Sequence, residues 1–384
     1  MSIYYLPSTI YHLLSTIYYL LSTIYHLLSS PPYCLLPTTY SRFSMNKYVF
    51  KKIGWALLTV LFVVLLNFFL FRILPGDPAR TVRDPRLKQD AIIALRERFG
   101  LDKPVINCVE AISPLKLGSC AANPLETQFG RYIINLLQGE LGTSFHTQRP
   151  VATILTENLW NTILLIGPGV FLSIIFGVLL GLIAAWKSRT VLDYGALIGA
   201  LVAWACPTFW FGMILLFWGS SQFGLPIGGK ITAGGNFSNV WEEWLDIGRH
   251  MILPTLTYSI IYAGQYTLFM RSAVLEIFSE DYVLTAKAKG LNSFQILRDH
   301  ALPNALLPTV TVVALNLGFL VSGAIEVETV YSWPGLGHAV VEAVGRQDYP
   351  VLQGAFLLLA VSVIFANLAA DLLYSYLDPR IQTG

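Results

Sequence analysis

The sequence predicts an all-α protein that crosses a membrane several times, and three observations support this class. Hydrophobic residues make up 54% of the 384 residues, and the mean hydropathy is +0.58. Only 12% of the residues are charged, whereas an ordinary soluble domain carries roughly 25%. The apolar residues also gather in uncharged runs of about 20 residues, the length that crosses the ~30 Å hydrocarbon core of a bilayer as a helix.

Six such runs predict six transmembrane helices, because backbone N–H and C=O groups in lipid have to find partners within their own segment. Pro168, Pro207 and Pro254 fall inside the runs. They predict kinks or helix starts, since proline lacks the N–H that a helix interior uses. From the N-terminus, the runs are Ile53–Phe71, Leu159–Trp186, Tyr194–Gln222, Met251–Met270, Ala301–Ile325 and Tyr349–Ala370.

The distribution of Lys and Arg predicts that both ends of the chain lie in the cytoplasm, where short loops of membrane proteins carry more basic residues. The same rule places the polar segment between the fourth and fifth runs, Glu280–Pro303, on the cytoplasmic side. The net charge of +2 gives no sign of a nucleic-acid partner. The basic residues that carry the bias are Lys47, Lys51, Lys52, Lys187, Arg189, Arg271, Lys287, Lys289, Arg298 and Arg380.

Residues 1–44 differ from the rest of the chain. They begin with four copies of a seven-residue repeat, IYYLPST, IYHLLST, IYYLLST and IYHLLSS, and they lack the basic start of a signal peptide. Two interpretations stay open: a seventh apolar helix, or an upstream extension outside the working fold, with Met45 as the natural start. We favour the second, which leaves a membrane domain at residues 45–384.

A long loop, residues 75–150, follows the first run and is predicted to lie on the outer side. Leu74–Pro78 ends the first helix, because two prolines interrupt it. Within the loop, Asp84 can cap an amphipathic helix and Gly100 can end it. We expect this helix to rest on the membrane or on the helix bundle.

Cys108 and Cys120 lie in the same loop. In an oxidising compartment the two thiols could form a disulfide. The alternative is two free thiols, and the sequence does not decide between them. Two pairs of glycines at a spacing of four, Gly177/Gly181 and Gly195/Gly199, predict close approach between helices, as small residues allow in lipid.

The polar segment Glu280–Pro303 predicts two short helices joined by a bend. Ser279 can cap the first helix, and Asp281 suits the positive end of its dipole. Gly290 can adopt the left-handed conformation that ends this helix. Together with the residues that lead into it, the segment covers residues 272–303.

The second short helix is predicted to begin at Asn292, with Gln295 placed to complete a capping box. Leu302-Pro303 is predicted to end it and to begin the fifth apolar helix. Ala286 and Ala288 give a surface of low relief that another protein could approach closely. From the residues alone, a docking surface for a soluble partner and an amphipathic linker at the membrane surface remain equally open.

No catalytic residue, metal ligand or bound cofactor is expected. Gly224–Lys230 satisfies the Gly-x4-Gly-Lys part of a phosphate loop, but Ile231 replaces the Ser or Thr that binds Mg²⁺, and no strand precedes it. The sequence has neither a His-Glu-x-x-His pair nor a Gly-x-Ser-x-Gly pattern. Glu326 and Glu328, at the end of the fifth run, are either functional or structural, and we favour a structural role.

The polar segment resembles the cytoplasmic coupling motif (EAA motif) of ATP-binding-cassette importer permeases. In the general motif a Glu-Ala-Ala triplet precedes a glycine at a fixed spacing, and Ile-x-Leu-Pro follows. Here Leu284-Thr285-Ala286, Gly290 and His300–Pro303 occupy these positions. The segment Asp281–Leu291 is more similar to the version found in the dipeptide/oligopeptide/nickel branch, Asp-Tyr-Val-x-Thr-Ala-basic-Ala-Lys-Gly-Leu, which it matches throughout.

Other motifs agree with this branch, in the same order along the chain, and the similarity covers about Met45 to Arg380. The repetitive leader and the segment around Asn107–Pro124 depart from the pattern. The further matching motifs are Leu74–Pro78, Gly139–Phe145, Glu328–Gly337, Asp348–Pro350 and Leu377–Arg380.

The resemblance implies a type I ABC importer permease bundle in the inner (plasma) membrane of a prokaryote. It implies a second, homologous permease subunit, two ATP-binding subunits that carry the ATP, and an extracytoplasmic solute-binding protein. Peptides, or another small solute such as nickel, are the implied cargo. The residues implied to contact the ATPase are Asp281, Tyr282, Thr285, Ala286, Lys287, Ala288, Lys289, Gly290, Leu291, Leu302 and Pro303.

An ion-coupled secondary carrier that works without an ATPase is the alternative. Such a carrier is expected to show internal repeats and charged residues at mid-membrane depth. Neither is evident in the sequence.

Overall fold

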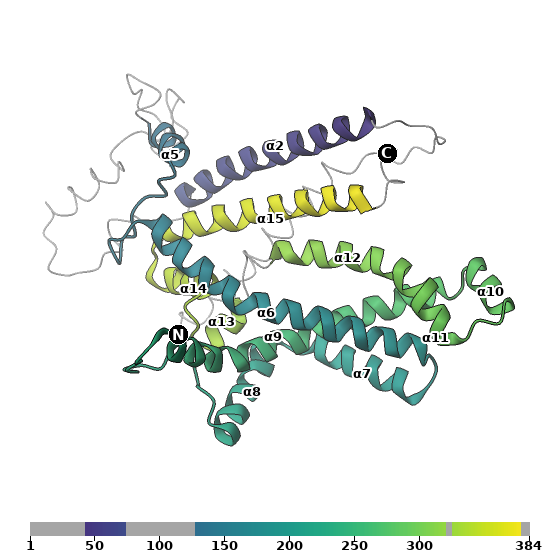
Figure 1. Ribbon diagram of the computed structural model, residues 1–384. Coiled ribbons are helices and arrows are strands. Elements are labelled where there is room, and N and C mark those ends of the chain that lie inside the picture. Colours follow the sequence, from purple (N-terminus) through teal and green to yellow (C-terminus); the bar gives the residue numbers. More distant parts are fainter. Residues whose placement is uncertain (1–42, 74–126, 320–324, 378–384) are drawn as a thin grey trace, which may run out of the picture. The chain divides into compact units, whose positions relative to one another are not determined.

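The computed structural model describes residues 43–73, 127–319 and 325–377 (Figure 1). Every regular element in these residues is helical, which confirms the predicted class. Three predicted features lie outside the described residues: the leader at residues 1–42, the helix between Asp84 and Gly100, and the cysteine pair Cys108 and Cys120. The helices are α2 (Phe43–Ile73), α5 (Gln128–Leu137), α6 (Val151–Trp186), α7 (Val191–Ala205), α8 (Thr208–Phe223), α9 (Val240–Ile277), α10 (Asp281–Ala288), α11 (Ser293–Ile296), α12 (Leu302–Phe319), α13 (Ile325–Val330), α14 (Leu336–Arg346) and α15 (Tyr349–Leu377).

Among the described residues, three helices are long and apolar enough to cross a membrane. They are α2 over Val49–Phe71, α6 over its whole length, and α15 over Tyr349–Leu372. The number rises to four if α7 and α8 together form one broken span. The predicted count of six is therefore not confirmed.

The third predicted run, Tyr194–Gln222, is not one continuous helix. It is divided into α7 and α8, which are bent by 102° at a short break. Cys206 has ψ 128° and Pro207 precedes the first residue of α8. Because a residue before proline is forced towards extended backbone, the helix ends there. The prediction of a helix start at Pro207 is correct, and the prediction of one continuous helix is wrong.

The fourth predicted run lies in α9, a 38-residue helix that contains Pro254. This helix contacts α7, α8, α12 and α13. Two of its threonines bond back to the helix: Thr257 Oγ1 donates to the Leu253 carbonyl at 2.9 Å, and Thr267 Oγ1 donates to that of Ala263 at 2.7 Å. Several polar residues of α9 are buried, namely His250, Thr255, Thr257, Tyr258, Ser259, Tyr266 and Thr267.

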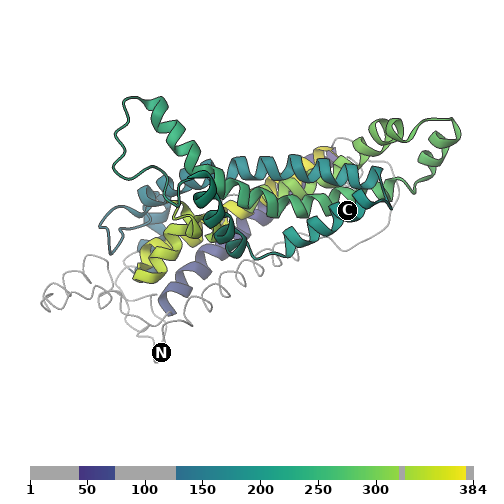
Figure 2. The same cartoon turned by 90° about the horizontal axis from the view of Figure 1, so that it is seen from below.

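Gly177 and Gly181 lie where α6 packs against α9, and both views show these two helices side by side (Figures 1 and 2). A Cβ added at Gly181 would lie 2.6 Å from the carbonyl oxygen of Thr267, so only glycine allows this approach. The described residues give no such contact at Gly195 and Gly199, because an added Cβ at either position would lie within 4 Å of none of them.

The contact between α7 and α9 depends instead on a glycine of α9. A Cβ added at Gly264 would lie 2.5 Å from the carbonyl oxygen of Ala200. Two glycines four residues apart are the sequence pattern that predicts such a contact. Gly264 does not show this pattern, because it is a single glycine that packs against Ala200 of another helix.

The contacts of the chain form two compact units. Of the described residues, the first unit contains 54–73, 127–158 and 339–361, and the second contains 43–53, 159–319, 325–338 and 362–377. The second unit holds the polar segment.

In the first unit, two of the motifs noted in the sequence bind each other. Ser144 Oγ donates to Asp348 Oδ2 at 2.5 Å, and the Phe145 N–H donates to Asp348 Oδ1 at 3.1 Å. Ser144 and Asp348 are both buried. Gly142, at φ +88°, allows the turn that brings Ser144 into place. The two motifs therefore have a structural role.

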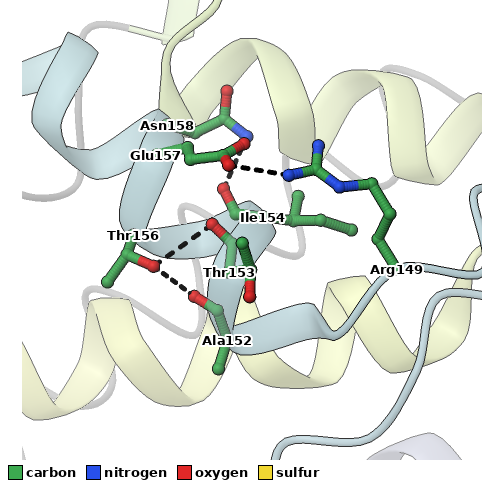
Figure 3. Close-up of polar contacts among 7 residues, drawn as sticks. All are labelled: Arg149, Ala152, Thr153, Ile154, Thr156, Glu157 and Asn158. Carbon is green, nitrogen blue, oxygen red and sulfur yellow. Dashed lines mark hydrogen bonds and ion pairs between the residues drawn. The ribbon is translucent and has the colours of Figure 1, made fainter.

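The start of α6 belongs to the same unit (Figure 3). Arg149 Nη2 lies 2.7 Å from Glu157 Oε1, but both side chains are about half exposed (51% and 54%), so this ion pair contributes little to stability. Thr156 Oγ1 donates to the Ala152 and Thr153 carbonyls, and Asn158 Nδ2 donates to that of Ile154. These bonds satisfy polar side chains within the helix itself.

Candidate coupling site

The polar segment lies at the end of α9 that is remote from α13 (Figure 1). Its first helix, α10, follows Glu280, whose backbone is extended and whose side chain makes no cap. Ser279 does not cap α10 as predicted. Its hydroxyl donates instead to the Glu276 carbonyl at 2.6 Å, and so satisfies the C-terminal turn of α9. Asp281 lies in the first turn of α10, as predicted.

Gly290 ends α10 as predicted, with φ +84°. The Gly290 N–H donates to the Lys287 carbonyl at 2.9 Å, and the Leu291 N–H donates to the Ala286 carbonyl at 3.3 Å. These two bonds form a Schellman motif, which satisfies carbonyls that a helix end leaves open. Leu291 and Ala286 also pack in one cluster, as is usual for this motif.

The second short helix begins with the predicted capping box. The Gln295 N–H donates to Asn292 Oδ1 at 2.9 Å, and the Asn292 N–H donates to Gln295 Oε1 at 3.0 Å. The helix α12 begins at Leu302, as predicted for the fifth run, but the prediction that Leu302-Pro303 ends the second short helix is wrong. A π-helical turn, Leu297–Ala301, connects α11 directly to α12. A wider turn of this kind accommodates a proline that cannot donate to the ladder.

The two short helices share a small apolar core of their own. Val283, Ala286 and Ile296 are buried in it, with exposed fractions of 0, 4 and 3%. Ile277 and Phe278, at the end of α9, pack against the same cluster. Ala286 thus faces the inside of the bend, and the prediction that it lies on a contact surface is wrong.

The opposite face of the polar segment is exposed. Leu284 and Phe294 are 54% and 52% exposed, so two large apolar side chains lie open on the polar segment. The sequence did not single out either residue, although Leu284 follows the buried Val283 and so lies on another face of the helix. The predicted coupling residues that are exposed are Asp281, Tyr282, Thr285, Lys287, Ala288, Lys289, Gly290 and Pro303, whereas Leu291 and Leu302 are half-buried.

The bend is anchored to the long helices of its unit. The Phe294 ring lies 5.7 Å from the Trp186 ring at the end of α6, between centroids. Leu297 and Ala301 pack into a buried cluster with Met270 and Val274 of α9. The two short helices are therefore attached both to α9 and to α6.

A second cluster lies at the other end of the same unit, around Glu328 on α13. Its carboxylate is fully buried. Thr162 Oγ1 donates to Glu328 Oε1 at 2.7 Å, and the His338 N–H donates to Glu328 Oε2 at 3.0 Å. Burial raises the pKa of Glu328 to about 7, although bonds from Thr162, His338 and Gly337 oppose the rise. Glu328 lies outside the apolar spans and caps the N-terminus of α14.

The rest of the motif Glu328–Gly337 packs around this carboxylate. Trp333 is fully buried, and its Nε1–H donates to the Asn161 carbonyl at 2.9 Å. An added Cβ at Gly335 would collide with the Glu328 carboxyl group, which explains the glycine. The motif therefore forms a structural junction between α6, α13 and α14, as favoured for Glu328 from the sequence.

The segment Gly224–Lys230 does not form a phosphate loop. It follows α8, and the next helix begins only at Val240. Its Gly229 N–H donates to the Tyr331 carbonyl at 2.9 Å, and Lys230 Nζ donates to Asn161 Oδ1 at 2.8 Å. The segment thus packs onto the Glu328 junction.

These features define a multi-pass helical membrane protein that presents a bent pair of short helices at the end of its central helix. The chain belongs to the family described as "Binding-protein-dependent transport system inner membrane component", whose sequence model matches residues 177–383. A second model, described as "Binding-prot-dependent transport system membrane comp, N-term", matches residues 45–166. The chain is thus an inner-membrane permease subunit of a transport system, as the resemblance implied, and not an enzyme.

Curated relatives agree over most of the chain. The dipeptide transport system permease protein DppB of Haemophilus influenzae is 36% identical over 352 residues, which cover 88% of this chain and 100% of the relative. The glutathione transport system permease protein GsiC of Salmonella paratyphi A is 34% identical over 339 residues, with 88% and 99% covered. The probable D,D-dipeptide transport system permease protein DdpB of Escherichia coli K12 is 35% identical over 348 residues, with 86% and 96% covered.

Proposed function

We propose that this permease forms half of the translocation path of an ATP-driven importer for peptides, in the dipeptide to oligopeptide range, or for a related small solute. The names of the relatives, which include dipeptide and glutathione systems, support a peptide-like cargo. The observation that carries the proposal is the polar segment, whose bent helices keep an apolar face exposed at the end of α9.

The exposed face of the polar segment is the surface that binds the ATPase in this proposal. Leu284 and Phe294 supply apolar area, and Lys287 and Lys289 supply charge around it. An exposed apolar patch bordered by polar groups is typical of a protein-binding site. The remaining partners are a homologous second permease, a second ATPase copy and an extracytoplasmic binding protein. The cytoplasmic placement of this face and of both chain ends rests on the basic loops.

Transport driven by ATP is tested with the whole assembly in vesicles. The genes adjacent to this chain are co-expressed with it, and uptake of a dipeptide mixture is measured with ATP supplied and the proton gradient collapsed. Uptake that continues under these conditions is the expected result. Uptake that follows the gradient and ignores ATP would establish the ion-coupled carrier instead. A chain that starts at Met45 is expected to transport at the same rate, because we propose that residues 1–44 lie outside the working fold.

Binding of the ATPase to the polar segment is tested by site-directed crosslinking. In a chain without Cys34, Cys108, Cys120 and Cys206, Leu284→Cys is expected to link to the nucleotide-binding subunit. Leu284→Cys leaves the buried core of the bend intact, since Leu284 is 54% exposed.

Ser238→Cys is the matched control, because Ser238 is exposed in the loop before α9, near the opposite end of that helix. It is expected to give no such link. Equal capture at both positions, or capture at neither, would contradict the assignment of the polar segment as the ATPase site.

A further inference from the structure

Asp193 and Arg271 form a buried ion pair between the start of α7 and the end of α9. Arg271 Nε lies 2.5 Å from Asp193 Oδ1, and Arg271 Nη2 lies 2.9 Å from Asp193 Oδ2. The Arg189 N–H also donates to Asp193 Oδ2, at 2.8 Å. The Asp193 side chain is only 1% exposed, and the Arg271 side chain is 22% exposed. Two parallel bonds of this kind fix both the distance and the orientation of the partners.

The α7 helix has few other attachments. Within the part of the chain that the structure describes, its only buried residues are Asp193 and Ala200. An ordered line of three contacts joins it to α9: Asp193 with Arg271, Ala200 with Gly264, and Trp204 with Tyr262, whose ring centroids are 5.8 Å apart. The other side of α7 is exposed, with Val191, Leu192, Tyr194, Ile198, Leu201 and Val202 between 48% and 88%.

The ion pair differs from the other two contacts in the movements of α7 that it resists. Packing of Ala200 against Gly264 and of the rings resists compression, but it resists separation or sliding only weakly. A bidentate ion pair resists both, because breaking it leaves an uncompensated charge at a buried position. Asp193 and Arg271 therefore fix the start of α7 to α9.

The position of Arg271 connects this contact to the polar segment. Arg271 lies near the C-terminal end of α9, and Ile277 and Phe278, at that end, pack into the core of the bend. A displacement of the bend therefore moves the end of α9, and Arg271 moves with it. The other end of α7 leads through the 102° break into α8. The Tyr331 hydroxyl donates to the Gly212 carbonyl of α8 at 3.0 Å, which ties α8 to the Glu328 junction.

We propose that the Asp193–Arg271 ion pair is a positioning strut that makes α7 and α8 follow movement of the polar segment. Without this ion pair, the partner subunits would still hydrolyse ATP, but the hydrolysis would no longer be converted efficiently into transport. This proposal rests on the ATP-driven function proposed above. It assigns to two residues outside the polar segment a role in transmitting the movement, whereas neither touches cargo or nucleotide.

The test measures ATP hydrolysis and cargo uptake in the same vesicles, which contain the complete transporter. Asp193→Asn and Arg271→Gln are each expected to lower the uptake per ATP hydrolysed roughly tenfold, while hydrolysis continues. The charge-reversed pair, Asp193→Arg with Arg271→Asp, is expected to recover most of the lost ratio. The Arg189 N–H, which loses its acceptor in the reversed pair, can bond to water because Arg189 is exposed. Glu157→Gln, which removes the exposed ion pair of α6, is the control and should keep the wild-type ratio.

Three results would overturn the strut. The first is an unchanged ratio in both single variants. The second is a loss of hydrolysis and uptake in equal proportion, which indicates general damage to the fold. The third is a reversed pair as defective as the single variants. Failure of the proposed function is a separate result, because the wild-type transporter itself would then show no ATP-driven uptake.

Discussion

Replacing Gly290 with valine is expected to remove most transport activity and to leave the chain in the membrane. Gly290 has φ +84°, in the left-handed region where a β-branched residue is strongly disfavoured. Space is not the limit, because an added Cβ at Gly290 would meet nothing within 4 Å. The backbone cost, about 1–2 kcal/mol or more, therefore falls on the bend itself and on its two Schellman bonds.

The measurement is vesicle uptake, corrected for the amount of permease in the membrane. Gly290→Val is expected to lower uptake roughly tenfold, the factor that ~1.4 kcal/mol produces. Gly290→Asn is the matched control: asparagine also adds a side chain but tolerates the left-handed conformation, so its uptake should stay near the wild-type rate. Normal uptake in the valine variant, or equal losses in both, would show that the left-handed turn is not what transport requires.

Glu328 is expected to make the fold less stable as the pH rises from about 5 to 8. Its pKa is about 7 in the folded chain, because of burial, and the ordinary value is 4.5. Between these values the folded state holds a proton that the unfolded state has lost, so the free energy of unfolding falls as pH rises. The contribution is fully present below pH 4.5 and is lost as the pH passes about 7. The difference in pKa corresponds to ~3 kcal/mol.

The measurement is the thermal unfolding midpoint of the purified transporter at a fixed heating rate. The midpoint of the wild-type protein is expected to fall by several degrees between pH 5 and pH 8, and Glu328→Gln is expected to flatten this slope, because the amide does not titrate. Glu342→Gln is the control, since Glu342 is half exposed in an ion pair with Arg346. A slope that is the same in the wild-type protein and the Glu328 variant would refute the assignment.

Local features of the polar segment were predictable because they depend on residues close together in the chain. The capping box of Asn292 and Gln295 spans one helical turn, and the left-handed turn at Gly290 needs only a glycine in the right place. The all-helical class follows in the same way from composition. These predictions succeed because no distant part of the chain competes with them.

The errors arise where distant contacts decide. Ser279 binds the end of α9, which extends further than the apolar run indicated. Ala286 faces inward because Ile296 and the end of α9 pack on that side of α10. Asp193 and Arg271 lie far apart in the sequence, and nothing in the local pattern of either residue identifies the other as its partner.

The break at Pro207 has a consequence for the surroundings of this chain. With 15 residues at about 1.5 Å each, α7 measures ~22 Å, which is less than the ~30 Å of hydrocarbon. Open backbone groups at a corner within the bilayer persist only where protein or water replaces lipid. A corner at this depth would therefore need protein or water, rather than lipid, beside its backbone groups.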